Sequence, residues 1–329
     1  MSGQFINAVA KKENNLFCRI LSDLITEKEG PQLQNKKLLI ELLILKIYHP
    51  NDFKEILGGY SNDTYLYTEE NLVLRLPKTY NPFFPELTVE IQNLDQAHRL
   101  NLTPLKVVAY YHKYSFLVTE YISNYQPLTP RDFKNPARLM ALAQLVKKLH
   151  YSRFNFKKNP ETATSFIDHS SQCFHTIQPI LTKKDYPILK KLLGIKNFLE
   201  KANPTKSPAH GDLHHFNIIE INGELQFMDW ELSSLEDPAY DISRLFCVTE
   251  FNHAQKEIFL RTYQNSAPVC LSEEDLKNLI KRIYLYESIN YFSIILWSRY
   301  AMPFFYANDQ NLIKDTIKHS RQQDKLIRY

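Results

Sequence analysis

The chain has 329 residues, of which 44% are hydrophobic and 23% are charged, so a disordered protein is excluded and two units with a core each can form. Forty basic residues stand against 36 acidic ones, and the net charge of +4 is too small to indicate a nucleic-acid partner. The basic residues are also scattered along the sequence rather than gathered in stripes.

The first part of the chain is predicted to be a helical extension followed by a small lobe of strands. Residues 1–52 are mainly helical in pattern, with a strongly apolar run at 38–47, and Pro50 closes the segment. Strands dominate residues 53–122, apart from one helix predicted around 87–100. We expect the extension to pack on this smaller lobe, the N-lobe.

A larger C-lobe is predicted over residues 123–329. Pro127 and Pro130 stiffen the connection into it, and apolar residues at helical spacing then predict a helix over 136–150. Residues 151–208 are predicted to be a further helical insertion. A polar segment with a hairpin follows, and the remainder of the chain is predicted to be helical to its end.

The polar segment His210-Gly-Asp-Leu-His-His-Phe-Asn217 supplies the residues that phosphoryl transfer requires. Asn217 follows Asp212 by five positions, as in catalytic loops whose Asp accepts the hydroxyl proton and whose Asn binds Mg²⁺. Residues 218–227 predict two strands joined by an Asn-Gly turn, which would bring Asp229 back beside Asn217. Taken singly, these residues could cap a helix, occupy a turn or end a strand. Their order favours a magnesium-phosphate site.

With this segment, the chain resembles the aminoglycoside phosphotransferase and choline kinase family, and within it the bacterial choline kinases. The resemblance covers about two hundred residues in the family's order. It implies an α+β, two-lobed protein-kinase-like fold with a small antiparallel sheet in the N-lobe and a larger, mainly helical C-lobe. It also implies ATP, Mg²⁺ and a small alcohol substrate. The matching segments are 58–65, 73–77, 118–122, 145–150, 210–217 and 237–243.

The phosphates are expected to lie against a turn and a neighbouring strand of the N-lobe. Gly58 and Gly59 stand between two predicted strands, where glycine lets a hairpin fold closely over phosphate oxygens, although a plain tight turn would have the same sequence. The resemblance places Ser61 and Asn62 beside the phosphates. Arg75, the only basic residue of the next predicted strand, is expected to neutralise them, with a solvated side chain as the alternative.

Two further nucleotide contacts are predicted. Glu90, on the helix after that strand, is expected to pair with Arg75 and fix its direction, unless it is an ordinary charge on a helix face. The change from apolar to polar residues across 117–122 suits an adenine slot, in which Glu120 and Ile122 lie where backbone groups read the edge of the ring. A buried strand that leads into a loop is the structural alternative.

Other polar residues near the motif are assigned supporting roles. His210 is expected to stabilise the loop's backbone by hydrogen bonding, and Asp241 to brace the same loop without touching substrate. The adjacent His214 and His215 have no carboxylate or cysteine partner at zinc-ligand spacing, so no zinc site is predicted.

The acceptor site is the part that residue patterns define least. A quaternary ammonium ion is bound by aromatic faces and carboxylates, and Glu231 follows Trp230 directly after Asp229. Trp297 resembles a residue of a late helix that lines this site in choline kinases, although a core tryptophan is an equally good interpretation. Leu232 and a further apolar residue, at position 294, stand where choline-selective members usually carry aromatic residues.

We therefore predict direct transfer of a phosphoryl group from ATP to the hydroxyl of choline or a related amino alcohol, with Asp212 as the catalytic residue and Asn217 and Asp229 as metal ligands. Thiamine, an aminoglycoside or another hydroxylated metabolite is the alternative acceptor. A non-catalytic protein that kept the fold is the alternative from another class, but the presence of all three polar residues disfavours it.

Cysteine spacing and apolar runs predict the compartment. The four cysteines lack the spacing of a zinc site or of a disulfide framework, which is typical of reduced thiols. The first residues lack the apolar segment of a signal peptide, and no uninterrupted apolar run approaches the ~18 residues of a membrane span. We expect a cytoplasmic protein. The cysteines are Cys18, Cys173, Cys247 and Cys270.

Overall fold

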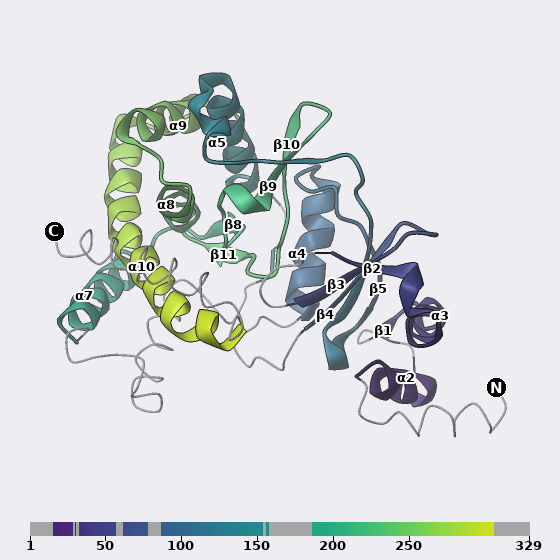
Figure 1. Ribbon diagram of the computed structural model, residues 1–329. Coiled ribbons are helices and arrows are strands. Elements are labelled where there is room, and N and C mark those ends of the chain that lie inside the picture. The colour runs from purple at the N-terminus through teal and green to yellow at the C-terminus, as the bar shows by residue number, and fades with distance from the viewer. Residues whose placement is uncertain are drawn as a thin grey trace.

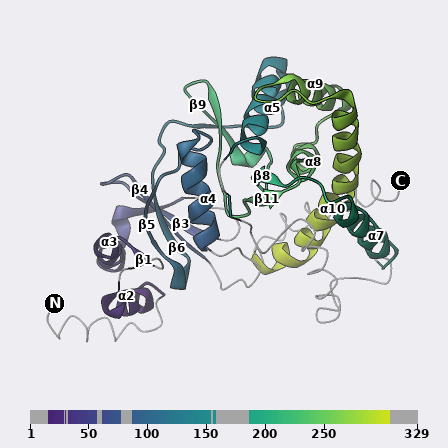
Figure 2. The same ribbon diagram turned by 180° about the vertical axis from the view of Figure 1, so that it is seen from behind.

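The computed structural model of the chain describes residues 16–28, 30, 33–56, 62–77, 87–153, 156–157 and 186–305. These residues form two bodies that lie side by side, one built on a sheet and one mainly of helices (Figure 1). Each body has its own cluster of buried apolar side chains. The view from behind shows the same arrangement, with one helix, α4, between the sheet and the helical body (Figure 2).

The first body contains a six-stranded antiparallel sheet in the order β1-β5-β6-β4-β3-β2. The alternation of Leu72, Leu74 and Leu76 with Val73 and Arg75 explains its two faces, since successive side chains of a strand point to opposite sides. The three leucines are buried, whereas the two residues between them are half-buried. The strands are β1 Leu33–Gln34, β2 Phe53–Ile56, β3 Asn62–Tyr67, β4 Leu72–Pro77, β5 Val107–Tyr111 and β6 Phe116–Glu120.

The leucine face of the sheet is covered by the N-terminal extension. Helices α2 (Leu16–Thr26) and α3 (Lys36–Tyr48) bury side chains such as Leu21 and Leu42 in the same cluster as Leu74. The expected packing of the extension on the smaller lobe is therefore present. The extension also contributes β1, which pairs with β5 and was not predicted, because a strand of two residues is too short to show a periodic pattern.

Helix α4 (Leu87–Arg99) links the two bodies. Its N-terminal turn carries Glu90 toward the sheet, whereas Leu94 and Ala97 belong to the apolar cluster of the helical body. Asn93, fully buried between them, donates to the backbone oxygens of Lys157 (3.2 Å) and Ser233 (3.0 Å). The helix is thus held by both bodies at once.

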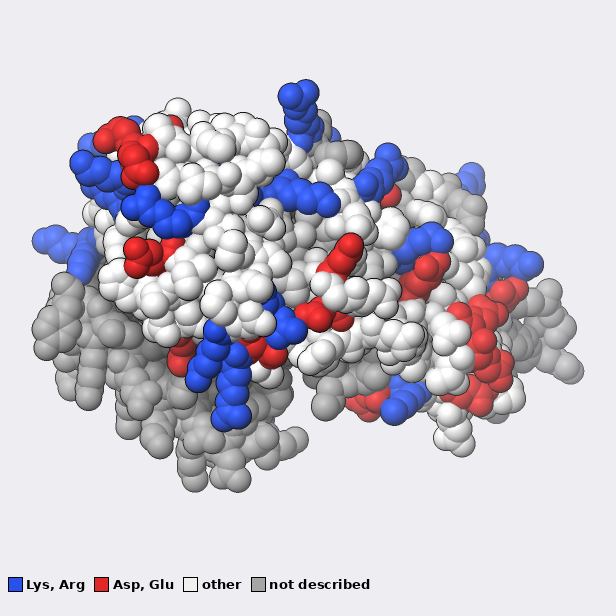
Figure 3. Space-filling view, turned by 90° about the horizontal axis from the view of Figure 1, so that it is seen from above, with Lys and Arg blue, Asp and Glu red and all other residues white. Residues whose placement is uncertain are grey.

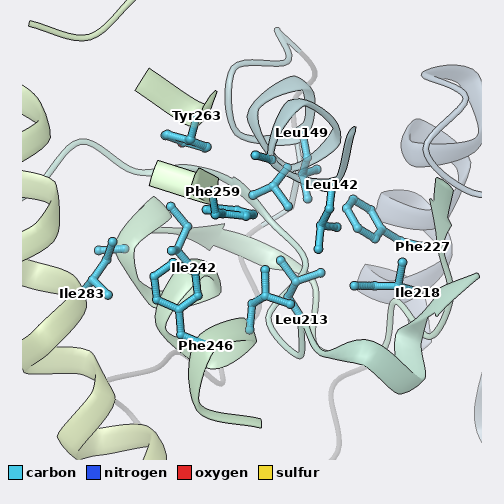
Figure 4. Close-up of a cluster of buried hydrophobic side chains, with 14 of the residues drawn as sticks. Leu142, Leu149, Leu213, Ile218, Phe227, Ile242, Phe246, Phe259, Tyr263 and Ile283 are labelled. Atoms are coloured by element: carbon cyan, nitrogen blue, oxygen red, sulfur yellow. The ribbon is translucent and has the colours of Figure 1, made fainter. Parts of the chain in front are cut away.

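The helical body surrounds a core of aliphatic and aromatic side chains from helices, loops and hairpin, of which Leu142, Leu213, Phe227, Phe246 and Phe259 are examples (Figure 4). Asparagine and aspartate caps followed by proline at the first helical position start α5 and α8, which fixes where these helices begin. The helices are α5 Pro136–His150, α7 Tyr186–Ala202, α8 Pro238–Val248, α9 His253–Asn265 and α10 Glu273–Phe305.

Two small sheets complete this body. The predicted hairpin is present as β9 (Ile218–Ile221) and β10 (Glu224–Phe227), and β7 (Gln126–Pro127) pairs with β9. Asn222 and Gly223 have φ values of 51° and 83°, as the tight turn of a two-residue hairpin requires. The second sheet pairs β8 (Ser207–Ala209) with β11 (Ser234–Glu236).

The β8–β11 pair lies in segments that were predicted to be helical, and that prediction is wrong there. Three-residue strands give no readable alternation, and Pro208 within β8 is unusual for a strand. Within the predicted insertion 151–208 the structure describes α7 and short flanking pieces, and the rest lies outside the described residues, as does the chain after 305. The lobe boundaries at 52 and 122 stay predictions.

Within the described ranges, none of the helices has the length and apolar character needed to cross a membrane.

On the face shown in Figure 3, basic and acidic side chains lie interspersed among uncharged ones. Four short 3-10 turns, η1 Pro50–Asp52, η2 His112–Tyr114, η3 Asp132–Lys134 and η4 His215–Asn217, occur in the described chain, and the last of them forms part of the site described next.

Candidate active site

The loop that contains Asp212 is held in place by Asp241 of α8. The Asp241 carboxylate accepts hydrogen bonds from the backbone N–H groups of His210 (2.7 Å) and Gly211 (2.8 Å) and from Nε2 of His150 (3.1 Å). Burial would raise the pKa of Asp241, but the bond from His150 and the nearby His210 hold it below its usual value. The predicted role of Asp241 as a brace of this loop is confirmed.

His210 ties the loop to the end of the hairpin. Its Nε2 donates to the backbone oxygen of Met228 (2.7 Å), and its Nδ1 accepts from the backbone N–H of Asp212 (3.3 Å). Burial lowers the pKa of His210, so the ring is neutral and suited to donate from one nitrogen and accept at the other. The ring also packs against Trp230 at 5.0 Å. The predicted supporting role of His210 is confirmed.

Gly211 allows the loop to approach the segment that follows the hairpin. Its φ is 83°, and a Cβ atom at this position would lie 2.0 Å from the backbone oxygen of Leu232. No side chain can be accommodated at that distance from a carbonyl oxygen. The glycine of the motif therefore permits the contact that brings Asp212 next to residues 229–232.

The Asp212 carboxylate has polar partners on both of its oxygens. Oδ1 accepts from Nε (2.9 Å) and Nη2 (2.8 Å) of Arg244, and Oδ2 lies 3.2 Å from Nε2 of His214 and 3.4 Å from Nδ2 of Asn217. Burial opposes ionisation, but the charges of His214 and Arg244 place the pKa of Asp212 far below its usual value. Asp212 is therefore a carboxylate at neutral pH.

Arg244 was not singled out in the sequence. It lies three positions after Asp241 on α8, and residues three apart on a helix share a face. That spacing is the signal that could have found it, once Asp241 had been assigned to the loop.

Asn217 and Asp229 flank the hairpin and meet at its open end. The register pairs Ile218 with Phe227, and the Met228 N–H donates to the Asn217 backbone oxygen at 2.9 Å. Asp229 has a φ of 57°, a left-handed conformation that aspartate tolerates better than most residues. The predicted return of Asp229 to the side of Asn217 is present.

The acidic residues that follow the hairpin have raised pKa values. Burial raises the pKa of Asp229 to about 6, against the opposing effect of Arg75 and with a further increase from Glu90. Burial, and next the charge of Asp229, raise the pKa of Glu231 well above its usual value. Several carboxylates lie close to a single guanidinium here, and this excess of acidic groups favours the binding of a cation.

These donors fit Mg²⁺ bound together with phosphates. Mg²⁺ takes oxygen ligands and is usually held by one or two carboxylates plus phosphate oxygens. The amide nitrogen of Asn217 donates to the Asp212 backbone oxygen (2.9 Å), so its amide oxygen is the atom that can face a metal. In the described part of the chain, no group of three or more His, Cys, Asp or Glu side chains could hold a metal ion.

The predicted ion pair between Arg75 and Glu90 is present. Nη2 of Arg75 lies 2.5 Å from Oε2 of Glu90, and the two side chains are 20% and 6% exposed. The strand alternation that buries the leucines of β4 turns Arg75 to the opposite face, where α4 brings Glu90. The pair therefore lies on the side of the sheet that faces the carboxylate cluster, and it rules out a freely solvated Arg75.

The connection between the bodies begins where β6 ends. The Glu120 N–H donates to the Lys106 backbone oxygen (3.1 Å), and its exposed side chain pairs with Lys106 Nζ (2.6 Å). The backbone N–H of Tyr121 donates to the backbone oxygen of Asn71 (2.7 Å), and the next residue, Ile122, is half-buried. The adenine contacts predicted for Glu120 and Ile122 stay predictions.

Other predicted residues are not brought into the site by the described structure. Trp230 is fully buried against Phe227 and Phe156, so it cannot present a face to a ligand, and the suggestion that it helps to bind an ammonium group is wrong. Its apolar ring points into the core because the residues on either side, Asp229 and Glu231, take the polar side of the segment. Gly58, Gly59 and Ser61 lie outside the described residues, as does the side chain of Trp297 in α10, while Asn62 opens β3 opposite Pro77.

Comparisons with known proteins show the family and the fold of the chain. The sequence model of the phosphotransferase enzyme family matches residues 52–273. Protein LicA homolog of Mycoplasma capricolum is 26% identical over 234 residues, which cover 71% of this chain and 84% of that protein. Choline kinase LicA from Streptococcus pneumoniae has a TM-score of 0.64 at 18% identity, with 88% of this chain and 99% of that chain covered. A structure of LicA in complex with AMP has a TM-score of 0.62 at 18% identity, with 87% and 96% covered.

Proposed function

Because the chain belongs to the phosphotransferase enzyme family, we propose that it is an ATP- and Mg²⁺-dependent kinase that phosphorylates the hydroxyl group of a small alcohol. The observation that carries this proposal is the convergence of Asp212, Asn217 and Asp229 at the open end of one hairpin, on a loop that Asp241 holds by two backbone N–H groups. A non-catalytic protein with this fold would not require this arrangement, so its presence favours catalysis.

The roles of the residues follow from their positions. Asp212 would accept a hydrogen bond from the acceptor hydroxyl and take its proton as the phosphoryl group is transferred. Asn217 and Asp229 would hold Mg²⁺, which neutralises charge on the phosphates. Arg75, directed by Glu90, would contribute a further positive charge to the phosphates.

The rest of the nucleotide would be bound by the smaller body. The predicted turn at Gly58 and Gly59, with Ser61 and Asn62, would cover the phosphates, and the backbone of the connection at Glu120 and Ile122 would read the adenine. The likeness to LicA, which was solved in complex with AMP, supports binding of an adenine nucleotide here.

For the acceptor we propose choline or a related amino alcohol. The support is the similarity to LicA, which the pneumococcal structure identifies as a choline kinase. The electrostatics of Glu231 add support, because burial and the charge of Asp229 raise its pKa, and a cationic head group nearby would favour its ionised form. Trp297, which resembles the residue that lines this site in choline kinases, would supply the aromatic face.

The test is ADP release by the purified protein with Mg-ATP and a panel of choline, ethanolamine, thiamine and an aminoglycoside. We expect turnover that depends on Mg²⁺ and on one amino alcohol, with EDTA abolishing it. Turnover with thiamine or an aminoglycoside alone would keep the kinase and remove the choline assignment. Absence of ADP release with every alcohol, from a folded protein that also fails to bind ATP, would contradict the proposed function.

A further inference from the structure

We propose that Arg244 is a positioning residue: it fixes the carboxylate of Asp212 through Oδ1 and so presents Oδ2 to the acceptor hydroxyl. The inference deepens the proposed function and rests on it. Nothing in the motif itself predicts this role, because Arg244 lies 32 residues further along the chain, on α8.

Two side chains on one face of α8 hold the catalytic loop. Asp241 binds the backbone of His210 and Gly211, and Arg244, one helical turn later, binds the side chain of Asp212. The first contact fixes where the loop lies, and the second fixes how the carboxylate is turned. A side chain with two rotatable bonds needs both constraints to hold one oxygen in place.

The helix that supplies both contacts is itself firmly placed. Asp237 caps its first turn by accepting from the Ala239 N–H at 3.0 Å. On the other side, α10 packs along α8, and Asn290 donates to the hydroxyl of Ser243, next to Arg244, at 2.6 Å. Arg244 therefore acts from a rigid element rather than from a loop.

The geometry divides the two oxygens of Asp212 between two tasks. Nε and Nη2 of Arg244 converge on Oδ1 at 2.9 and 2.8 Å, and such charge-assisted bonds are strong and directional. Oδ2 faces His214 and the amide of Asn217, on the side where the metal ligand lies. An acceptor hydroxyl that binds Oδ2 would therefore be directed toward the phosphoryl group.

Phosphoryl transfer passes through a loose transition state that leaves little covalent chemistry to the protein, so positioning of the acceptor hydroxyl is the contribution that Arg244 can make through Asp212. Displacement of a positioned group by about 1 Å can cost on the order of 100-fold in rate, which sets the size of effect that Arg244 can exert.

The chain offers a matched control for an ordinary ion pair. Arg282 of α10 pairs with Asp237, the N-cap residue of α8, at 2.7 Å, and its side chain is 23% exposed, compared with 20% for Arg244. Arg282→Ala should therefore reproduce the loss of a part-buried arginine next to α8, without any effect on the orientation of Asp212.

The experiment compares wild type, Arg244→Ala, Arg244→Lys and Arg282→Ala. For each protein, kcat and the KM values for ATP and for the acceptor are measured, together with ATP hydrolysis in the absence of acceptor and Tm. We expect Arg244→Ala to lower kcat about 10- to 100-fold with KM for ATP unchanged, and Arg244→Lys to recover part of kcat because one ammonium can still bind Oδ1. Arg282→Ala should lower Tm at least as much and keep kcat within about twofold.

Three results would overturn the proposal. In the first, Arg244→Ala retains full kcat. In the second, it raises only the KM for the acceptor and leaves hydrolysis unchanged, which would make Arg244 an acceptor-binding residue. In the third, its loss of kcat merely parallels a loss of Tm, as in Arg282→Ala.

The failure of this inference can be told apart from failure of the proposed function. If wild type phosphorylates no alcohol, crystal structures of wild type and Arg244→Ala still decide the point. A carboxylate of Asp212 that turns away from Asn217 in the variant supports the positioning role. One that keeps its place overturns it, whatever the acceptor.

Discussion

Two carboxylates that lie within one site, Asp212 and Asp229, are held in opposite electrostatic surroundings. The charges of His214 and Arg244 keep the pKa of Asp212 far below its usual value, whereas burial raises that of Asp229 to about 6. Pairs of acids whose pKa values are driven apart commonly serve different roles in catalysis. Here the ionised group suits the hydroxyl, and the group with the raised pKa suits a metal ion.

Replacement of Asp212 by Asn tests the first of these roles. The amide oxygen of Asn can still accept from Arg244, so the fold and the nucleotide site should be preserved, but the group no longer accepts a proton. We expect kcat to fall by about 10²- to 10⁴-fold with little change in the KM for ATP. Steady-state kinetics and an ATP titration measure the two effects, and a large loss of ATP affinity at normal turnover would reverse the assignment.

Replacement of Asp229 by Asn tests the second role. Asn tolerates the left-handed backbone at this position, and it removes a charge from a crowded acidic cluster, so Tm should not fall. With one metal carboxylate missing, we expect activity to drop by about 100-fold or more and to recover only in part at high Mg²⁺. Rates measured across a Mg²⁺ series, beside Tm, separate these effects. Full activity at ordinary Mg²⁺ would contradict the metal assignment.

At the scale of secondary-structure elements, α5 contains a lysine in the core. Lys147 is fully buried, its Nζ has no hydrogen-bond partner, and the rings of Tyr151 and Tyr263 lie 4.5 Å from it. Burial lowers the pKa of this amine to about 8. The two rings offset part of the cost of the charge, because cations are attracted to aromatic faces.

We expect Lys147→Met to raise the free energy of unfolding at pH 7 by about 1 kcal/mol, since it fills a similar volume without a buried charge. The unfolded chain holds the lysine proton up to about pH 10.4, whereas the folded protein releases it near pH 8, so wild type gains stability from this group over that interval. The advantage of the variant should therefore shrink between pH 8 and 10. Urea unfolding of both proteins at pH 7 and pH 10 measures this, and a variant that is less stable at pH 7 would show that the aromatic rings outweigh burial.

The elements also show which structural features can be predicted from residue patterns. The hairpin at 218–227 and the pair of Arg75 with Glu90 were predictable, because an Asn-Gly turn and a lone basic residue on an alternating strand each favour one local arrangement. Arg244 and the β8–β11 pair were not, because both depend on contacts between segments far apart in the chain. Trp230 was misjudged since its neighbours in sequence are polar, although its ring is packed in the core.

At the scale of the whole molecule, the N-terminal extension is part of the core of the smaller body. Leu21 and Leu42 are buried in the cluster that contains Leu74 of the sheet, and β1 covers the edge of β5. An uncovered apolar face and a free strand edge both favour aggregation.

Removal of residues 1–49 should therefore give an insoluble or unfolded chain, rather than a smaller active enzyme. In the full chain, Leu42→Ala should cost about 2–4 kcal/mol, while Lys37→Ala on the exposed side of α3 should cost less than about 0.5 kcal/mol. Gel filtration of the truncated chain and thermal melts of the two point variants provide the measurements. A soluble truncated chain with unchanged Tm would show that the extension is an independent appendage.

Leu94, Ala97 and Asn93 anchor α4 in the helical body, whereas Arg75 lies on β4 of the sheet. A movement of the sheet relative to the helical body would therefore separate Arg75 from Glu90. While the ion pair is formed, it would hold the guanidinium of Arg75 in place relative to the catalytic loop. When the ion pair breaks, Arg75 would move away from the site together with the sheet. Release of product and loss of the active geometry would be one and the same motion.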